Sequence, residues 1–172
     1  SPKNTVTIKK CVFSENTALD KDSDNNQMYG GSCIFLTARS GVIIRNRFFN
    51  NFGSGSVKLY NDFDDNENQN QKLLESSLED ASVLIKECAF EISKNEKCSV
   101  FYDRGNKGAL FELKECTFSG ELQKGSNYID GRVISENSPL LVVNQCKFDI
   151  DLKKSNKFNE KLIKINPNDQ SF

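Results

Sequence analysis

A short motif recurs along the chain and constrains its fold more than any other feature of the sequence. The motif reads apolar, any, apolar, any, any, cysteine, any, phenylalanine, and its clearest copy is FELKECTF at residues 111–118. Four further segments fit it: VTIKKCVF at 6–13, VIIRNRFF at 42–49, VLIKECAF at 83–90 and LVVNQCKF at 141–148. The copies begin 36, 41, 28 and 30 residues apart. Repeats in this range are typical of a solenoid, a propeller or another array of stacked units.

The alternation of apolar residues within each copy predicts short strands with one buried face. A second strand-like piece follows each motif, in the order Ile34/Leu36, Val57/Leu59, Val100/Tyr102, Val133/Ser135 and Ile163/Ile165. No 3.6-residue period runs through a whole repeat, and about three strands per repeat are fewer than a propeller blade needs. We therefore predict an all-β fold, a single-stranded parallel β-helix of about five coils in which like residues stack on like.

The coils mark out one predicted β-helix domain over residues 1–172. We expect coils near 6–36, 42–60, 83–102, 111–135 and 141–165, with a long excursion at 61–82. Within the excursion, Leu74, Leu78 and Ala81 have helical spacing, which predicts one short amphipathic helix that folds back on the column. Because the sequence shows neither a signal-peptide pattern nor an initiator methionine, we expect it to be a segment of a longer chain.

Two coils continue the motif as phenylalanine, any, any, asparagine, at residues 13–16 and 48–51, and a Gly-Gly pair precedes Ile34 in the first coil. This pattern resembles the repeats of polymorphic outer-membrane proteins and related surface adhesins. It is also similar to the wider pectin-lyase-like group of right-handed parallel β-helices. The later coils depart from the pattern, with Ser93, Glu121 and Asp151 in place of the asparagine. The resemblance implies a right-handed coil, an adhesive or carbohydrate-binding role, and an extracellular or cell-surface location.

The second coil places Arg47 where the other copies have cysteine. A bare arginine in the core would be costly. Three explanations are open: the register slips locally, Arg47 meets a carboxylate, or its side chain turns outward. We favour a local slip of the register.

The six cysteines suggest an interior column rather than a disulfide framework. Cys11, Cys88, Cys116 and Cys146 share one position of the repeat, where a free thiol acts as a small apolar side chain. Stacked side chains point the same way, which disfavours disulfide geometry. Cys33 and Cys98 lie two coils apart, so we expect free thiols.

Composition excludes several classes of function. The formal net charge is −1, which argues against a nucleic-acid-binding protein. The sequence contains no run of about 18 apolar residues, the length that would predict a membrane-spanning helix. The chain has no histidine, the commonest general base and metal ligand. The acidic series Asp20, Asp22, Asp24 lacks the twelfth-position ligand of a calcium loop. We therefore expect no cofactor, no metal site and no catalytic residues.

The first candidate binding surface is a column of basic residues that follow the apolar pair: Lys9, Arg45, Lys86 and Lys114. Stacked coils would place them roughly 5 Å apart. Such a column would suit an acidic glycan. The alternative is that Glu87 and Glu115 neutralise it.

The second candidate is an apolar face that points away from the core, formed by Ile43, Leu84, Phe35, Phe101 and Ile134. Contiguous apolar surface usually marks a contact with protein. Its partner would be another protein or the remainder of the same chain, unless residues 61–82 cover it.

These expectations favour a non-catalytic structural or adhesive interaction module of a larger surface or assembly protein, which binds protein through an apolar face. Strand edges at both ends of the column would also promote association. The alternatives are a glycan-binding module and a polysaccharide lyase or hydrolase of the pectin-lyase-like class. Glycoside chemistry needs paired carboxylates, and no outward column stacks acid on acid.

Overall fold

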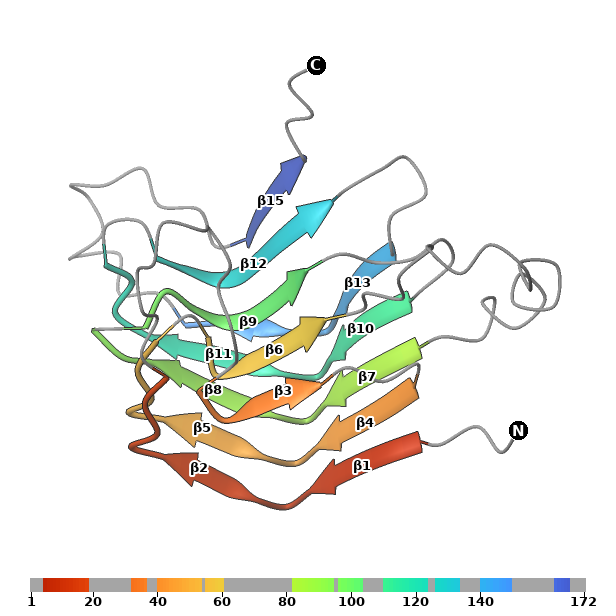
Figure 1. Ribbon diagram of the computed structural model, residues 1–172, viewed down its shortest axis with the longest axis horizontal. Coiled ribbons are helices and arrows are strands. Elements are labelled where there is room, and N and C mark those ends of the chain that lie inside the picture. The colour runs from red at the N-terminus through yellow and green to blue at the C-terminus, as the bar shows by residue number, and fades with distance from the viewer. Residues whose placement is uncertain are drawn as a thin grey trace, which may run out of the picture.

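The computed structural model describes residues 5–18, 32–36, 40–53, 55–60, 82–94, 96–103, 110–123, 126–133, 140–149 and 163–167, and it arranges their strands in three sheets (Figure 1). The first sheet contains β1 (Thr5–Lys9), β4 (Ser40–Ile44), β7 (Ser82–Lys86), β10 (Leu110–Lys114) and β13 (Leu140–Asn144). The second contains β2 (Val12–Ser14), β5 (Arg47–Phe49), β8 (Ala89–Ile92), β11 (Thr117–Gly120) and β14 (Lys147–Phe148). The third contains β3 (Ile34–Leu36), β6 (Val57–Tyr60), β9 (Cys98–Asp103), β12 (Asn127–Val133) and β15 (Ile163–Pro167).

All pairings between these strands are parallel, and each joins a strand to the one three places along the chain. We call each set of three consecutive strands a rung, from the first rung (β1, β2 and β3) to the last rung (β13, β14 and β15). Figure 1 shows the rungs stacked from the bottom of the molecule to the top. The prediction of an all-β, solenoid-like stack of parallel strands is thereby confirmed.

The described residues contain no helix. The helix predicted in the excursion falls on residues 61–81, which lie outside the described residues, and Ser82 already belongs to β7.

The core lies between the three sheets and is built from columns of side chains in register. In the middle rungs the side chains of these columns are fully buried. Ile43, Ile85, Phe48 and Phe90 are each only 1% exposed. The first sheet contributes the columns Val6/Gly41/Val83/Phe111/Leu141 and Ile8/Ile43/Ile85/Leu113/Val143. The third sheet contributes the column Ile34/Val57/Val100/Ile129/Ile163.

The phenylalanine of the motif forms a ladder of stacked rings along the second sheet. Consecutive ring centroids lie 4.7 to 5.1 Å apart, and the rings are within 10° of parallel. Offset aromatic pairs contribute about 0.5–1.5 kcal/mol each beyond the burial of their area. The ladder runs through Phe13, Phe48, Phe90, Phe118 and Phe148.

The corner between the first and second sheets has the same backbone conformation in every rung. Its apex residue has φ between 52° and 57°, in the left-handed region, although none of the five is glycine. Hydrogen bonds to the neighbouring rungs stabilise this conformation. The Glu87 N–H donates to the Lys114 carbonyl at 3.0 Å, and the Thr117 N–H donates to the Cys88 carbonyl at 2.9 Å. The five apex residues are Lys10, Arg45, Glu87, Glu115 and Gln145.

The residue after the apex points into the corner, and it is cysteine in four rungs and Asn46 in the other. The Cys88 thiol donates to the Ile43 carbonyl of the preceding rung at 3.5 Å. The Asn46 amide does the same, with Nδ2 donating to the Ile8 carbonyl at 3.0 Å. Its Oδ1 accepts from the Cys11 N–H at 2.7 Å. The position therefore favours a small side chain that can donate a hydrogen bond. An apolar residue there would leave the carbonyl of the preceding rung without this donor.

The register of the second rung corrects the alignment made from sequence. Gly41, not Val42, pairs with Val6 and Val83, so the motif of this rung begins one residue earlier than predicted. Asn46 consequently occupies the cysteine column, and Arg47 is exposed. The favoured explanation, a local slip of register, is confirmed. The glycine hides the pattern because it puts no apolar side chain at a core-column position. A Cβ at Gly41 would lie 2.8 Å from Leu36 Cδ2, so a larger residue would require the Leu36 side chain to shift.

The fourth rung also differs from its prediction in the third sheet. β12 pairs Ile129 with Val100, so the residue of this strand that occupies the Val100 column lies four positions before the predicted Val133. Gly131, which pairs with Tyr102, interrupts the apolar alternation on which the prediction depended. Ser135 lies outside the described residues.

Candidate functional site

Three of the four predicted basic residues share one column of the first sheet, and the fourth does not. Lys86 pairs with Lys114 across the sheet, and Lys9 lies in the same column. The slip in register places Ile44 in this column and moves Arg45 to the corner apex. The predicted continuous basic column is therefore wrong at the second rung.

Carboxylates on the apex column neutralise the cations beside them. Arg45 Nε lies 2.6 Å from Glu87 Oε2, and Lys86 Nζ lies 3.2 Å from Glu87 Oε1 and 3.7 Å from Glu115 Oε2. Hydrogen bonds from Arg45 and Lys86 lower the pKa of Glu87, and the hydrogen bond to Glu87 raises the pKa of Lys86. These surface pairs contribute little to stability. They do offset the charges of Arg45 and Lys86, two of the four cations predicted to bind an acidic glycan.

The predicted apolar face is only partly present. Ile43 is 1% exposed and belongs to the core, because the slip in register turns it inward. Leu84 is half-buried on the outside of β7, and Phe35 is 48% exposed on β3. Ile134 lies outside the described residues.

Phe101 faces away from the core columns, yet it is only 3% exposed. In the register of the third sheet it lies beside Lys58, which is 2% exposed and places Nζ 5.1 Å from the Phe101 ring centroid. A cation over an aromatic face is favourable, and more so when it is removed from water. Neither side chain offers an open surface to a partner.

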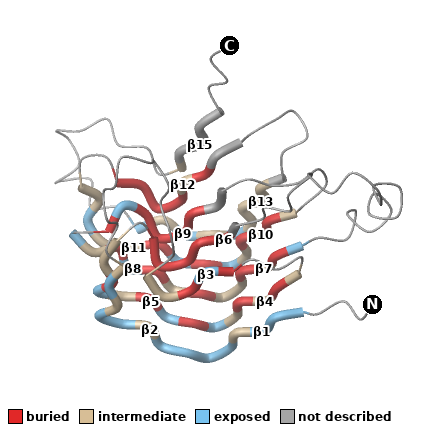
Figure 2. The backbone as a smooth tube through the Cα atoms, viewed as in Figure 1, coloured by how far each residue is buried: buried red, intermediate tan, exposed pale blue. Residues whose placement is uncertain are grey.

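The sequence analysis predicted exposed strand edges at the ends of the column, but it did not name the core-facing side chains that lie open at the first rung. Val6 is 39% exposed, whereas Val83 in the same column is 4% exposed. Ile8 and Phe13 are half-buried and Cys11 is exposed, although their columns are closed in the middle rungs (Figure 2). The sequence signal was available, because the end unit of any stack has one uncovered side.

The outer edges of β1 and β2 add backbone groups to this surface. In the second rung, the Arg47 N–H donates to the Cys11 carbonyl at 3.0 Å, pointing down the stack. Val12 is the counterpart of Arg47 in the first rung, and no strand of the described residues lies beyond β2. An extended segment placed along this edge would therefore meet a free strand edge beside open core columns. We call this surface, formed by β1, β2 and their core-facing side chains, the open first rung.

A buried polar cluster lies where the second sheet ends. Asn51 Nδ2 donates to the Phe13 carbonyl at 3.2 Å and to Ser56 Oγ at 3.3 Å, and its Oδ1 accepts from Asn16 Nδ2 at 3.0 Å. Ser56 Oγ donates to Glu96 Oε1 at 2.5 Å. The two asparagines of the F-x-x-N pattern thus satisfy interior polar groups, as buried polar groups require.

Glu96 is 3% exposed, and burial raises its pKa to about 7, while hydrogen bonds from Ser56 and the Ser93 N–H oppose the rise. Burial disfavours the charged form of a carboxyl group. It accepts hydrogen bonds from Ser56 and the Ser93 N–H, so we assign Glu96 a structural role at the end of the polar cluster.

All six cysteines are free, as predicted. Burial raises the pKa of Cys98 and of Cys33, which keeps both as thiols near neutral pH. Cys11 is the exposed member of the six.

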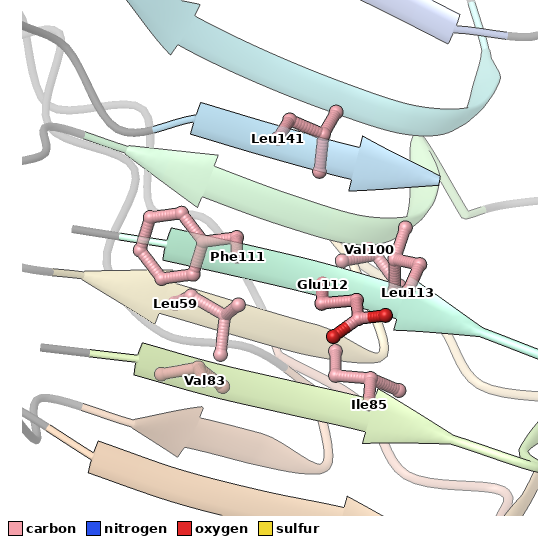
Figure 3. A pocket seen from close by; sticks show the side chains of 8 residues that line it. All are labelled: Leu59, Val83, Ile85, Val100, Phe111, Glu112, Leu113 and Leu141. Atoms are coloured by element: carbon pink, nitrogen blue, oxygen red, sulfur yellow. The ribbon is translucent and has the colours of Figure 1, made fainter. Parts of the chain in front are cut away.

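Described residues line an open groove and a small interior void. One is an open groove of about 440 Å³ lined by Asn50, Phe52, Glu91, Ile92, Ser93, Lys94, Gly120 and Glu121. The other, shown in Figure 3, is an interior void of about 10 Å³ lined mostly by aliphatic and aromatic side chains of β6, β7, β9, β10 and β13. A void of that size holds at most one water, and an apolar one stays empty. It is a packing defect of the core, with no room for a ligand.

Within the described part of the chain, no three cysteine or carboxylate side chains lie close enough together to hold a metal ion. The acidic series at residues 20–24 lies outside that part. No helix among the described residues has the length and apolar character needed to cross a membrane.

Comparison with known proteins returned no match: no family model, no curated protein and no solved structure corresponds to this chain.

Proposed function

We propose that the chain is a non-catalytic interaction module, a right-handed parallel β-helix of five coils within a larger surface or assembly protein, which binds protein through its open first rung. The observation that carries the proposal is the exposure of core-facing side chains there, with Val6 39% exposed and Cys11 exposed beside two free strand edges. Apolar side chains and unpaired backbone groups side by side favour the addition of a strand from a partner. The resemblance to surface-protein repeats supports the handedness and a cell-surface location.

The sides of the stack have less support as the binding surface. On the first sheet, Arg45 and Lys86 pair with carboxylates at the corner. On the third sheet, Lys58 and Phe101 are closed to solvent. An acidic-glycan site on the basic residues is therefore the weaker proposal. The end of the stack instead offers apolar columns that only another rung would complete.

A rung-like peptide tests the proposal. The sequence of residues 110–120, LFELKECTFSG, supplies both apolar columns, the corner and the ladder phenylalanine. Its cysteine would be replaced by asparagine, the residue that occupies the same column at Asn46. We expect saturable binding by fluorescence anisotropy, together with slower alkylation of Cys11 as the peptide covers it.

The matched control is the same peptide with its Leu113→Pro change, which removes a backbone donor and distorts the strand. Equal binding of the two peptides, or binding that leaves Cys11 as reactive as before, would contradict strand addition at the open first rung.

A further inference from the structure

We infer that the partner of the open first rung is the last rung of a second copy of this chain, so that copies stack head to tail. The inference rests on the proposed function, because it names the protein that the first rung binds. It starts from the fact that the two ends carry the same columns. The register links the first-rung residues Val6, Ile8, Cys11 and Phe13 through the stack to the last-rung residues Leu141, Val143, Cys146 and Phe148.

The last rung is also partly open. β13, β14 and β15 lie at the edges of their sheets. Phe148 and Cys146 are half-buried, whereas Phe118 and Cys116 in the rung below are 0% and 1% exposed. Each end of the stack therefore has columns that lack one neighbour.

The hydrogen bonds of the corner show how the two ends would join. Between the last two rungs, the Glu115 N–H donates upward to the Asn144 carbonyl at 2.9 Å, and the Lys147 N–H donates downward to the Cys116 carbonyl at 2.8 Å. Repeating this pattern across a junction pairs the Gln145 N–H of one copy with the Lys9 carbonyl of the next. It also pairs the next copy's Val12 N–H with the Cys146 carbonyl of the first. All four groups lie at sheet ends and already have the required direction.

The thiol column continues by the same rule. Cys146 Sγ donates to the Leu113 carbonyl of the preceding rung at 3.4 Å. Cys11 has no preceding rung among the described residues, and its Sγ donates only within its own corner, to the Lys9 carbonyl at 3.4 Å. In the stacked pair, Cys11 Sγ would donate to the Val143 carbonyl of the neighbouring copy.

The phenylalanine ladder continues as well. Phe13 stacks on Phe48 at 5.0 Å, and Phe148 stacks on Phe118 at 5.0 Å, so each terminal ring has one stacked face. Head-to-tail stacking places Phe148 of one copy against the other face of Phe13 of the next. The ladder would then run through both molecules without a break.

Strand direction distinguishes this arrangement from a symmetric dimer. A head-to-tail contact keeps every junction strand parallel to its neighbour, as inside the chain. Joining two first rungs by a two-fold axis would make the strands antiparallel. It would also exchange at least two of the three sheets across the contact, so the columns of like residues would not all continue from one copy into the other. A head-to-tail contact is heterologous, so it leaves a free end and adds further copies.

Charge does not oppose the junction. The first-rung corner presents Lys9 and Lys10, whereas the last-rung corner presents the neutral Asn144 and Gln145. Like charges therefore do not meet across the stacked corners.

The test combines mass with thiol reactivity in a concentration series of the reduced protein. We expect the average mass by light scattering to rise with concentration. We expect Cys11 and Cys146 to lose reactivity toward an alkylating agent together, because one covers the first rung and the other the last. Cys98, which is 1% exposed, serves as the internal reference.

Two variants of the same rung separate the junction from the outer surface. Val6→Lys places a charge in an open core column and should weaken association at least tenfold. Thr7→Lys makes the same change on an exposed side chain of β1 that points outward and that would stack beside the uncharged Val142 of the neighbouring copy, so it should associate like the unmodified chain.

Three outcomes would overturn the inference: a monomer with reactive Cys11 at every concentration, protection of Cys11 alone, or protection of Cys146 alone. The last two would indicate a symmetric contact between like ends.

The rung-like peptide distinguishes a failure of this inference from a failure of the proposed function. Without self-association, peptide binding that protects Cys11 would leave the proposed function standing and remove only the second copy as its partner. Failure of both experiments would remove both.

Discussion

At the residue scale, the position after the corner apex joins each of rungs two to five to the preceding rung by a side-chain hydrogen bond. Cysteine provides the bond with its thiol, and Asn46 provides it with an amide. The two residue types differ in shape and polarity, yet both are small and both reach the carbonyl of the preceding rung. The shared carbonyl explains why asparagine replaces cysteine without disturbing the stack.

This equivalence predicts the effect of changing Asn46. Asn46→Ala leaves the part-buried Ile8 carbonyl and Cys11 N–H without their partner and removes a buried side chain, which should lower the free energy of unfolding by about 1–3 kcal/mol. Asn46→Cys restores the donor of the other rungs and should cost less. Urea denaturation of both variants measures the difference, with the exposed Arg47→Ala as the control expected to stay near the unmodified chain. Equal losses for alanine and cysteine would contradict the hydrogen-bonding role.

Glu96 predicts a pH dependence of stability. Its pKa is raised from 4.5 to about 7 in the folded chain, so the native state holds this proton more tightly than the unfolded chain does. The stabilisation is complete below about pH 4.5, falls as the pH rises toward 7 and is lost above it, with a total of about 3 kcal/mol. Glu96→Gln should abolish this decline.

Urea midpoints between pH 5 and pH 8 measure the decline for the unmodified chain and for Glu96→Gln. The exposed Glu91→Gln is the matched control and should keep the full pH dependence. A decline of the same size in all three proteins would assign it to other groups.

At the scale of the strand, position in the stack decides how much a core residue contributes. Val6 on β1 and Val83 on β7 occupy the same column, but a rung covers Val83 on both sides. Each rung of a solenoid contacts only its neighbours, so its end strands lack half of these contacts. The strands that pair on one side only are also the ones expected to open most readily.

The two valines provide a direct comparison. Val83→Ala should lower the free energy of unfolding by about 2 kcal/mol, since it deletes two buried methyl groups and leaves a cavity. Val6→Ala should lower it by less than about 1 kcal/mol, because that side chain is already 39% exposed. Chemical denaturation at a protein concentration low enough to prevent association gives both values. A loss at Val6 as large as that at Val83 would mean that something covers the first rung in solution.

Strand register also explains where the candidate surfaces were misplaced. One glycine, Gly41, stands where an apolar residue was expected, and the alignment shifted by one residue to avoid it. That shift exchanged the inside and outside of β4, because successive side chains of a strand point to opposite faces. Ile43 was therefore assigned to the surface and Arg45 to the basic column. Gly131 had a similar effect on β12.

At the scale of the whole molecule, the open surfaces are set by the ends of the stack rather than by its sides. Salt bridges occupy the corner where Arg45 and Lys86 lie, and Phe101 is closed to solvent although it faces outward. The end surface exists because rungs stack in one direction and, among the described strands, the first rung has a neighbour on one side. No single segment of sequence carries that information.

The repeat alone determined that this chain would form parallel strands stacked in register, because each copy has one apolar face that only another copy would bury. It also predicted the free cysteine column and the ladder phenylalanine in four of the five rungs, since identical residues at identical repeat positions stack; in the second rung the ladder residue is Phe48 and not the predicted Phe49. Tertiary structure decided the register at Gly41, the partner of Arg45, the burial of Lys58 and Phe101, and the polar cluster that raises the pKa of Glu96. These features depend on which residues meet across rungs some 30 to 40 positions apart. A local sequence pattern does not determine such contacts between rungs, because a single glycine is enough to shift the register that the pattern predicts.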